Sequence, residues 1–329
     1  MSITYYIGID GGGTKTYGLI ADEEGHLLSS TKRDTSNYLQ VGIEKAKDNL
    51  VGMIQELCDS QKIDMLTFDY AVLGLAGAGR QDDRDTIMEA LTSTGIRIPQ
   101  LEIVPDFNIA LAGGTLGDPG VIIISGTGSV VYGVNEFGET KRAGGWGHIL
   151  ADEGAGYQFG HEALIAVMRA FDGRGQSTKL TEKILKQLNL ESPEKLVKWS
   201  LSEGIQKSNV AALAPCVFEA INEQDKVAEQ ILETAVDGII EMVIAVAKGL
   251  GITNEPFKIV LAGGNFSHQP KFVDLLRKKL KPVAPKAIAD LPRFEPVVGA
   301  ILLAMKNQEV PITNEIIKNI ESTWPKMGL

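Results

Sequence analysis

One short pattern occurs twice in this chain, and this internal repeat constrains the fold more than any other feature. Residues 7–21 (Ile-Gly-Ile-Asp-Gly-Gly-Gly-Thr-Lys-Thr-Tyr-Gly-Leu-Ile-Ala) align without gaps with residues 122–136 (Ile-Ile-Ile-Ser-Gly-Thr-Gly-Ser-Val-Val-Tyr-Gly-Val-Asn-Glu). Each copy reads as an apolar strand, a turn of glycines and a hydroxyl residue, and a second strand, which is typical of a β-hairpin. Chance similarity between glycine-rich hairpins is the alternative, and a duplicated domain explains the match better.

The remainder of the chain fits two α/β halves. A polar turn containing glycine follows each hairpin, at 23–25 and 136–138, so a third strand is expected in both halves. The turn Gly117-Asp118-Pro119-Gly120 marks the expected boundary, which gives domains 1–117 and 118–329. Hydrophobic spacing predicts helices over 43–60, 82–93, 107–112, 155–171, 178–188, 209–222, 227–250 and 296–306, and short buried strands over 70–76, 101–105 and 257–261.

Composition excludes several classes of function. The 329 residues are about twice a common domain length, and the formal net charge of −10 argues against binding to nucleic acid or to acidic membranes. No stretch reaches the roughly 20 apolar residues of a membrane span, and the start lacks the basic segment of a signal peptide. Cys58 and Cys216 form no pair motif and are expected to be buried thiols in a reducing compartment. We therefore expect a cytoplasmic protein.

The first hairpin turn has the composition of a phosphate-binding loop. Three consecutive glycines let the backbone approach an anion and direct successive amides at it. The turn is neither a dinucleotide-binding fingerprint nor a P-loop, because both need a helix next and residues 16–21 look like a strand. An ordinary hairpin turn is the alternative. The candidate phosphate-binding residues are Gly11, Gly12, Gly13, Thr14 and Lys15.

Two further glycine turns follow predicted strands. The turn over 125–129 is the counterpart of the first turn, which suggests two clamps on one polyphosphate. The turn over 262–265 closes the strand 257–261 and is expected to leave room for a flat adenine, although close helix packing also explains a Gly-Gly pair. The candidate phosphate contacts are Gly126, Thr127, Gly128 and Ser129, and the candidate adenosine contacts are Gly263, Gly264 and Asn265.

Two aspartates stand at the ends of predicted strands. Asp10 lies inside the first phosphate turn, where a carboxylate would repel phosphate unless a cation intervened, so we expect it to hold Mg²⁺ through water. Asp106 follows the strand 101–105 and precedes a helix. It is either the cap of that helix or a general base that faces the transferred phosphoryl group.

The stretch 143–156 combines glycines, an aromatic ring and carboxylates. Gly145 and Trp146 offer an apolar surface for a sugar ring, and Asp152 with Glu153 offers acceptors for hydroxyl groups. The two carboxylates also precede a predicted helix, where acidic residues favour the dipole. His148 is as consistent with a structural histidine as with a ligand contact. Asn37 is a candidate contact from the first half or simply a loop residue.

These motifs resemble the N-acetylglucosamine kinase family, which is grouped with the BadF/BadG/BcrA/BcrD ATPases in the sugar kinase, heat-shock ATPase and actin superfamily. The resemblance rests on residues 7–16, 124–129, 144–148 and 152–154, in the right order over nearly the whole chain. It implies an α/β, actin-like ATPase fold, with two ribonuclease-H-like domains around a central cleft and C-terminal helices (about 297–329) packed on the first. It assigns catalysis to Asp106 and sugar contacts to Asn37, Asp106, Thr127, Gly145, Trp146 and Asp152.

The expected activity is therefore phosphoryl transfer from Mg-ATP to an amino sugar. N-acetylglucosamine, phosphorylated at its 6-hydroxyl, is the first choice of acceptor by family likeness. N-acetylmuramic acid, N-acetylmannosamine, glucosamine and glucose remain open, and a homodimer is expected from relatives. The alternative from another class is an ATP-driven activator without a sugar acceptor. Related activators bind an iron–sulfur cluster through cysteines, and the positions of Cys58 and Cys216 provide no such ligand set.

Overall fold

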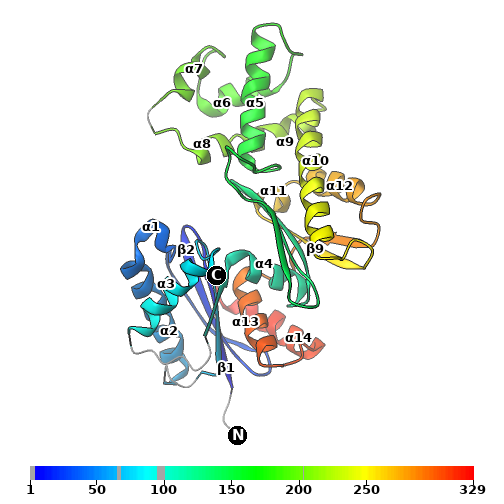
Figure 1. The fold of residues 1–329 in the computed structure, drawn as a ribbon. Helices are drawn as coiled ribbons and strands as arrows, with labels where there is room; N and C mark the ends of the chain where they lie inside the picture. Colours follow the sequence, from blue (N-terminus) through cyan, green and yellow to red (C-terminus); the bar gives the residue numbers. More distant parts are fainter. Residues whose placement is uncertain (1–3, 65–67, 95–100, 203) are drawn as a thin grey trace. The chain divides into compact units, whose positions relative to one another are not determined.

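The computed structural model describes residues 4–64, 68–94, 101–202 and 204–329. Its chain divides into two compact units (Figure 1). Unit 1 comprises Met1–Asp118 and Pro292–Leu329, and unit 2 comprises Pro119–Leu291. Unit 1 is therefore built from both ends of the chain. In the sequence, the whole of unit 2 comes between the two segments of unit 1.

A five-stranded mixed sheet forms the centre of unit 1. Its strand order is β3-β2-β1-β4-β5, in which β2 is antiparallel to both β1 and β3, and β4 is parallel to both β1 and β5. The hairpin of β1 and β2 and the third strand β3 lie where the sequence predicts them. The strands are β1 (Tyr5–Gly11), β2 (Lys15–Asp22), β3 (Leu27–Asp34), β4 (Tyr70–Leu75) and β5 (Leu101–Pro105).

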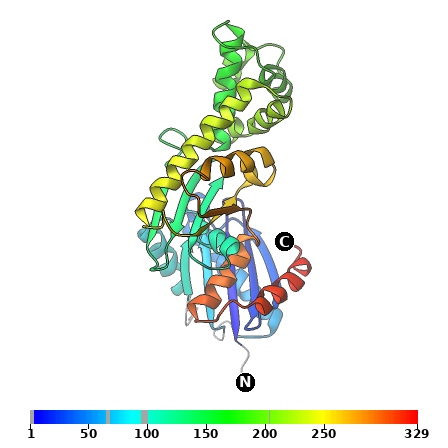
Figure 2. The ribbon, with the colours of Figure 1, turned by 90° about the vertical axis from the view of Figure 1, so that its right-hand side faces the viewer.

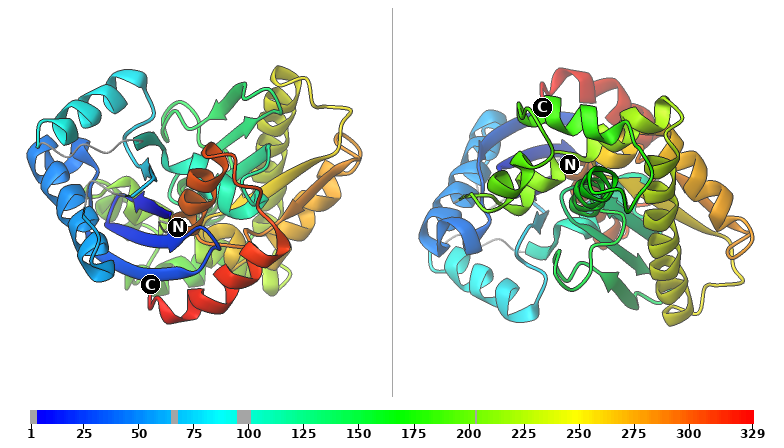
Figure 3. Two further views of the ribbon diagram at one scale, coloured as in Figure 1. Left: turned by 90° about the horizontal axis from the view of Figure 1, so that it is seen from below. Right: turned by 90° about the horizontal axis from the view of Figure 1, so that it is seen from above.

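Helices cover both faces of this sheet (Figure 3). Neighbouring residues of β1 show the alternation of a strand buried on both sides, because Tyr6 and Ile7 belong to two different cores. The core around Ile7 includes residues of α2 and α3, and the core around Tyr6 includes residues of α4, α13 and α14. The helices are α1 (Tyr38–Val41), α2 (Ile43–Gln61), α3 (Gln81–Thr92), α4 (Asp106–Thr115), α13 (Pro296–Asn307) and α14 (Asn314–Thr323), followed by the 3₁₀ turn η1 (Trp324–Lys326).

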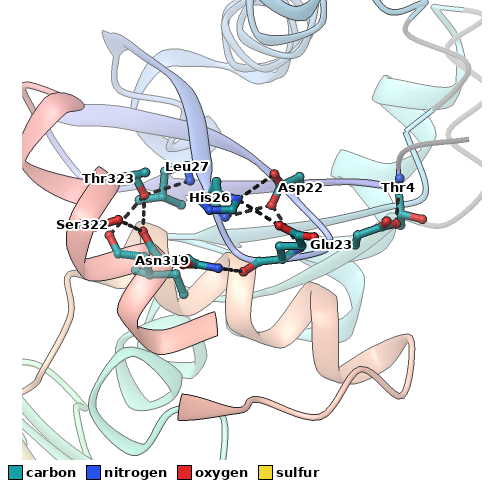
Figure 4. Close-up of polar contacts among 10 residues, drawn as sticks. Thr4, Asp22, Glu23, His26, Leu27, Asn319, Ser322 and Thr323 are labelled. Atoms are coloured by element: carbon teal, nitrogen blue, oxygen red, sulfur yellow. Dashed lines mark hydrogen bonds and ion pairs between the residues drawn. The ribbon is translucent and has the colours of Figure 1, made fainter. Parts of the chain in front are cut away.

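Helix α14 is attached to the β2–β3 turn by polar contacts (Figure 4). Thr323 Oγ1 accepts a hydrogen bond of 3.0 Å from the amide of Leu27, and Asn319 Nδ2 donates to the carbonyl of Glu24 at 2.8 Å. The turn itself is closed by Asp22, whose carboxylate accepts from the backbone amide of His26. The last helix of the chain thus belongs to the same unit as the first hairpin.

Unit 2 repeats the sheet of unit 1. Its order is β10-β9-β6-β7-β8, with β6 antiparallel to β7 and parallel to β9, as β1 is to β2 and β4. Each hairpin closes with a short turn beyond its last strand pair, Gly11 with Thr16 in unit 1 and Ser125 with Ser129 in unit 2, and the second turn is one residue shorter. The two copies of the sequence repeat are therefore the central hairpins of two similar sheets. Its strands are β6 (Gly120–Ser125), β7 (Ser129–Val134), β8 (Thr140–Gly144), β9 (Phe257–Ala262) and β10 (Ala287–Asp290).

The repeated Tyr-Gly pair of each hairpin lies where a helix approaches the second strand. A Cβ at Gly18 would lie 2.7 Å from Met53 Sδ of α2, and a Cβ at Gly133 would lie 2.8 Å from a Leu250 methyl group at the end of α10. Ordinary carbon contacts are longer than this. Both glycines therefore bring a helix close to the sheet, and the same packing requirement accounts for the same residue in both copies.

Between β8 and β9, unit 2 carries a run of helices, of which α10 is the longest (Figure 2). Helices α5, α9, α10 and α12 share one apolar core with β6, β7 and β9. The helix predicted over 209–222 is wrong as one element. It is divided at 212–213, because Pro215 near the start of α9 has no backbone N–H to donate to the carbonyl four residues earlier, although Ala212 and Leu213 keep helical dihedral angles. The helices are α5 (Gly156–Phe171), α6 (Leu180–Leu188), α7 (Lys195–Ser200), α8 (Lys207–Ala211), α9 (Ala214–Asn222), α10 (Lys226–Gly249), α11 (Gly264–Ser267) and α12 (Pro270–Leu280).

Candidate functional site

Asp10 and Asp106 lie at the same edge of the unit 1 sheet. The parallel strands β1, β4 and β5 are in register there, with Gly11 opposite Leu75 and Leu75 opposite Pro105. Asp10 is the residue before this row and Asp106 is the residue after it. Ligands of open α/β sheets bind at the carboxyl ends of the strands. The topology therefore brings the two aspartates to the position where chemistry is expected.

The two carboxylates share an electrostatic environment that suits a cation. Burial raises the pKa of Asp10 to about 7, and the charges of Asp106 and Glu295 add to the effect. Burial also raises the pKa of Asp106, whose Oδ1 accepts a hydrogen bond from the Phe107 amide at 2.9 Å. Such a cluster of partly buried negative charge is stabilised when a positive ion binds beside it. The donor set fits Mg²⁺, which binds one or two carboxylates and completes its shell with water and phosphate oxygens.

Asp106 is the first residue of α4, and the N-cap position is held by Pro105. The side chain accepts from the next amide and not from the second or third residue of the helix, as a capping side chain would. The capping alternative from the sequence therefore does not describe this residue. Its carboxylate remains available for another partner.

The first glycine turn is held by its own backbone. The amide of Gly12 donates to the carbonyl of Lys15 at 2.9 Å, and the hydroxyl of Thr35 donates to the carbonyl of Gly12 at 2.8 Å. In the described part of the chain, the amides of Gly13 and Thr14 have no backbone partner, so they are the ones that can meet an anion. Lys15 Nζ contacts Asp34 at 3.1 Å on the exposed surface.

Asn37 has a structural role in this structure. It is the N-cap of α1, where its Oδ1 accepts from the amide of Leu39 at 3.1 Å. A Cβ at Gly77 would lie 2.7 Å from the same oxygen, so Gly77 leaves room for the cap. The oxygen is engaged in capping, and the Nδ2 amide group is the part of the side chain that could bind a hydroxyl group.

The second glycine turn is bound to the acidic loop at 152–154. Ser125 Oγ donates to the carbonyl of Gly154 at 2.5 Å, and Ser129 Oγ donates to the carbonyl of Glu153 at 2.7 Å. The amide of Gly156 donates to the carbonyl of Gly126 at 2.7 Å. Hydrogen bonds therefore hold the candidate phosphate turn and the candidate sugar-binding loop together. Thr127 is exposed at the tip of the turn.

The third turn supports the second one. A Cβ at Gly263 would lie 2.3 Å from the Ser125 carbonyl oxygen, so the close approach of two strand ends requires glycine here. Asn265 Nδ2 donates to Ser125 Oγ at 3.0 Å and to the Gly126 carbonyl at 3.1 Å. Close packing thus explains Gly263, while the space beside Gly264 is open, with its nearest outside atom 4.0 Å away.

Asp152 is paired with a lysine that sequence reasoning missed. Its side chain is 5% exposed, and its Oδ2 lies 2.5 Å from the Nζ of Lys207, the first residue of α8. Asp152 also has a φ of +105°, an unfavourable value for a residue with a side chain, and such strain concentrates at functional sites. The neighbouring Glu153 turns back, and its Oε2 accepts from the amide of Asp152 at 3.2 Å. Only proximity in the folded chain reveals Lys207, because no motif surrounds it in the sequence.

Trp146 extends into solvent with 62% of its surface exposed. The guanidinium of Arg142 lies over one face of its indole, 4.2 Å from the ring centroid, and the preceding Gly145 has a φ of +70°. Nearby, the His148 and Tyr157 rings are 4.6 Å apart and help to line a cavity of about 260 Å³ that includes Asp152. Trp146 thus lies two residues before His148 in the loop that, together with α5, lines this cavity.

The order and spacing of these segments identify the family. A model of the BadF/BadG/BcrA/BcrD ATPase family matches residues 7–304. The chain belongs to the BadF/BadG/BcrA/BcrD ATPase family. The match includes all three glycine turns, both strand-end aspartates and the acidic loop.

The chain is also similar to known kinases over most of their length. The chain is 35% identical to the N-acetylmuramic acid/N-acetylglucosamine kinase of Clostridium acetobutylicum, over 91% of this chain and 98% of that protein. It is 33% identical to the N-acetyl-D-glucosamine kinase of Dictyostelium discoideum, over 94% of this chain and all of that protein. A solved structure of a proposed N-acetylglucosamine kinase from Chromobacterium violaceum superposes with a TM-score of 0.70 and 26% identity, over 92% of this chain and 100% of that one. The predicted family and the actin-like α/β fold are confirmed.

The two cysteines lie in different helices of the chain. Cys58 lies in α2 of unit 1 and Cys216 in α9 of unit 2, and both are buried. Burial raises the pKa of each thiol to about 11, which disfavours the thiolate that metal binding requires. Within the described ranges, no group of three or more His, Cys, Asp or Glu side chains is placed to hold a metal ion. The described helices also include none with the length and apolarity needed to cross a membrane.

Proposed function

We propose that this protein is an ATP-dependent sugar kinase that converts N-acetylglucosamine to N-acetylglucosamine 6-phosphate. The observation that carries the proposal is the pair of aspartates beside a glycine turn, Asp10 and Asp106, in a chain that is similar to amino-sugar kinases over 91–94% of its length. A second copy of the glycine turn, rigidly joined to Asp152, supplies the remaining parts that phosphoryl transfer needs: phosphate ligands and hydroxyl acceptors.

Asp106 is the proposed general base. Burial raises its pKa, which makes the carboxylate a better proton acceptor than an exposed aspartate. It would hold the attacking hydroxyl and accept its proton as the sugar oxygen bonds to the γ-phosphorus and the bond from that phosphorus to the bridging oxygen of ADP breaks. The amides of the glycine turns would stabilise the charge on the phosphoryl oxygens at fixed positions. Asn37, Thr127, Gly145, Trp146, Asp152 and Glu153 are the proposed sugar contacts.

Asp10 would hold Mg²⁺ through water, with Asp106 and Glu295 contributing to the negative potential around it. The ion would supply positive charge to the β- and γ-phosphate oxygens. Asp10 suits a water-mediated contact with the ion, because it directly precedes the glycine turn and its carboxylate is partly buried. Gly11, Gly12, Gly13, Thr14 and Lys15 are the proposed phosphate contacts of unit 1. Gly126, Thr127, Gly128 and Ser129 have that role in unit 2, and Gly263, Gly264 and Asn265 would contact adenosine.

N-acetylmuramic acid is the second candidate acceptor. It is named together with N-acetylglucosamine in the Clostridium relative, and it differs by an anionic lactyl group on the 3-oxygen. The cavity beside Asp152 contains the further carboxylates of Glu153 and Glu162. Repulsion from these groups favours the uncharged N-acetylglucosamine. Glucosamine and glucose would lack contacts to the acetyl group.

We expect ADP release to depend strongly on sugar. A coupled assay with Mg-ATP and a panel of N-acetylglucosamine, N-acetylmuramic acid, N-acetylmannosamine, glucosamine and glucose measures this directly. N-acetylglucosamine should have the highest kcat/KM. Each uncompensated loss of a polar contact should lower kcat/KM by roughly tenfold. Sugar-independent ATP hydrolysis at the same rate would instead indicate an activator ATPase.

We expect Asp10→Asn to raise the Mg²⁺ concentration needed for half-maximal activity, because the amide has no charge to hold the ion. The substitution also removes repulsion from Asp106 and Glu295, so the stability of the fold should be retained or increased. A titration of activity against Mg²⁺ checks this, with Asp48→Asn on the exposed face of α2 as the matched control. A titration of Asp10→Asn that overlays the wild type would contradict the metal role.

We also propose that the protein functions in the cytoplasm as a homodimer. Two buried, unpaired thiols are consistent with a reducing compartment. The dimer is an expectation from family resemblance alone, and analytical ultracentrifugation measures it.

A further inference from the structure

Lys207 is a cation at the second glycine turn to which the sequence motifs assign no role. It begins the short helix α8, and its side chain is 28% exposed. Its Nζ lies 2.5 Å from Asp152 Oδ2. A Cβ on Gly128 would lie 2.9 Å from this nitrogen and 3.1 Å from the same carboxylate oxygen. The ion pair therefore lies directly against the turn, and a side chain at position 128 would displace it.

The framework around the pair is rigid on one side and adjustable on the other. Ser125 and Ser129 bind the carbonyls of the acidic loop, which fixes Asp152 relative to the turn. Lys207, in contrast, reaches the turn on a flexible four-carbon side chain. Its ammonium can therefore shift toward a new acceptor while Asp152 and Gly128 stay in place.

The hydrogen-bonding capacity of this ammonium exceeds what Asp152 uses. An ammonium has three donors, and Asp152 is the acceptor that it contacts among the described residues. The amides of a glycine turn attract phosphate oxygens, and a lysine beside such a turn adds a full positive charge. Two donors at the edge of the turn are thus free to bind an oxyanion.

We propose that Lys207 contacts a terminal phosphate of the nucleoside triphosphate while it stays paired with Asp152. One cation would then connect the residue that accepts the sugar hydroxyl with the turn that binds phosphate. This inference rests on the proposed kinase function, because it treats the turn as a phosphate site. Lys207 also keeps the carboxylate of Asp152, which is 5% exposed, from being an unpaired buried charge.

The test compares the binding of two nucleotides by isothermal titration calorimetry. A non-hydrolysable ATP analogue with Mg²⁺ carries the terminal phosphates, and AMP lacks them. We expect Lys207→Met to weaken the ATP analogue roughly tenfold or more, which corresponds to one charged hydrogen bond, and to change AMP binding little. Lys207→Arg keeps the charge and should recover much of the affinity. Lys226→Met removes an exposed lysine of unit 2 and serves as the matched control.

A second variant guards against a purely structural explanation. Lys207→Met leaves Asp152 unpaired, and the double variant Lys207→Met/Asp152→Asn removes that charge as well. The double variant should recover the fold and still bind the ATP analogue weakly. Equal binding of the ATP analogue by wild type and the double variant would overturn the proposal, and so would an equal loss of AMP binding. Because these readouts need no turnover, a wild type that phosphorylates no sugar would refute the kinase function separately.

Discussion

Asp106→Asn is expected to reduce kcat at least roughly a hundredfold, the scale on which enzymes lose rate when a general base is removed. The amide has nearly the same shape as the carboxylate but cannot accept the proton of the attacking hydroxyl. Its oxygen can still accept the hydrogen bond from the Phe107 amide, so the local structure should persist. The coupled ADP-release assay at saturating ATP and N-acetylglucosamine measures the loss.

A stability measurement distinguishes the proposed catalytic role of Asp106 from a structural role. Burial raises the pKa of Asp106, and its charge raises the pKa of Asp10, so the carboxylate costs the folded state free energy. Its removal should leave the free energy of unfolding unchanged or higher. Asp48→Asn, the same change on an exposed face of α2, should alter neither property. Wild-type turnover in Asp106→Asn, or loss of its fold, would refute the assignment.

Gly299→Ala is expected to destabilise unit 1 by about 2 kcal/mol or more. Helices α4 and α13 cross there, and a Cβ at Gly299 would lie 1.9 Å from the Ile109 carbonyl oxygen and 2.5 Å from the Gly113 amide nitrogen. Alanine is favoured over glycine in a helix by about 1 kcal/mol. Backbone atoms cannot rotate away as a side chain can, so overpacking of about 3 kcal/mol or more should outweigh that gain.

Urea unfolding followed by circular dichroism measures this effect. Gly79→Ala is the matched control, because a Cβ there meets nothing within 4 Å and φ at this residue is not positive. It should change the free energy of unfolding by less than about 0.5 kcal/mol. A Gly299→Ala variant as stable as Gly79→Ala would show that α4 and α13 can separate without cost.

The sequence predicted the repeated elements well because their signals are local. Glycine turns between apolar strands placed both hairpins, and helical spacing located α2 and α10 within a residue or two. Helix α12 was missed although Phe272, Val273, Leu276 and Leu280 form a buried stripe on it. Its first turn, Pro270 after a polar loop, is also a recognisable start signal. The edge strand β10 was missed as well, because its four residues are too few to show a strand periodicity.

The candidate site was predictable where a motif carries it and not where distant segments meet. The sequence places Asp10 and Asp106 each at the end of a strand, and the register of β1, β4 and β5 brings these strand ends to one edge of the sheet. Lys207 is 55 residues from Asp152 in the sequence, and the residues around Lys207 form no motif that predicts the ion pair. The reason for Gly263 was likewise hidden, since it depends on a close approach to Ser125 in another strand. The sequence motifs thus indicate the proposed reacting groups, whereas the ion-pair partner Lys207 and the supporting contacts of the turns are seen only in the folded chain.

The discontinuity of unit 1 has a consequence for biosynthesis. The face of β1 that α13 covers is so closely packed that a Cβ on Gly8 would lie 2.8 Å from the Val297 carbonyl oxygen. A ribosome makes roughly 5–20 residues per second, so α13 is synthesised roughly 10–40 s after β5. During this interval the face of β1 that α13 covers stays uncovered. Unit 2 is one continuous segment and can complete its core meanwhile. The nascent first sheet is thus the part of the chain that most needs protection by chaperones, and stop codons late in the message would leave its apolar face permanently open.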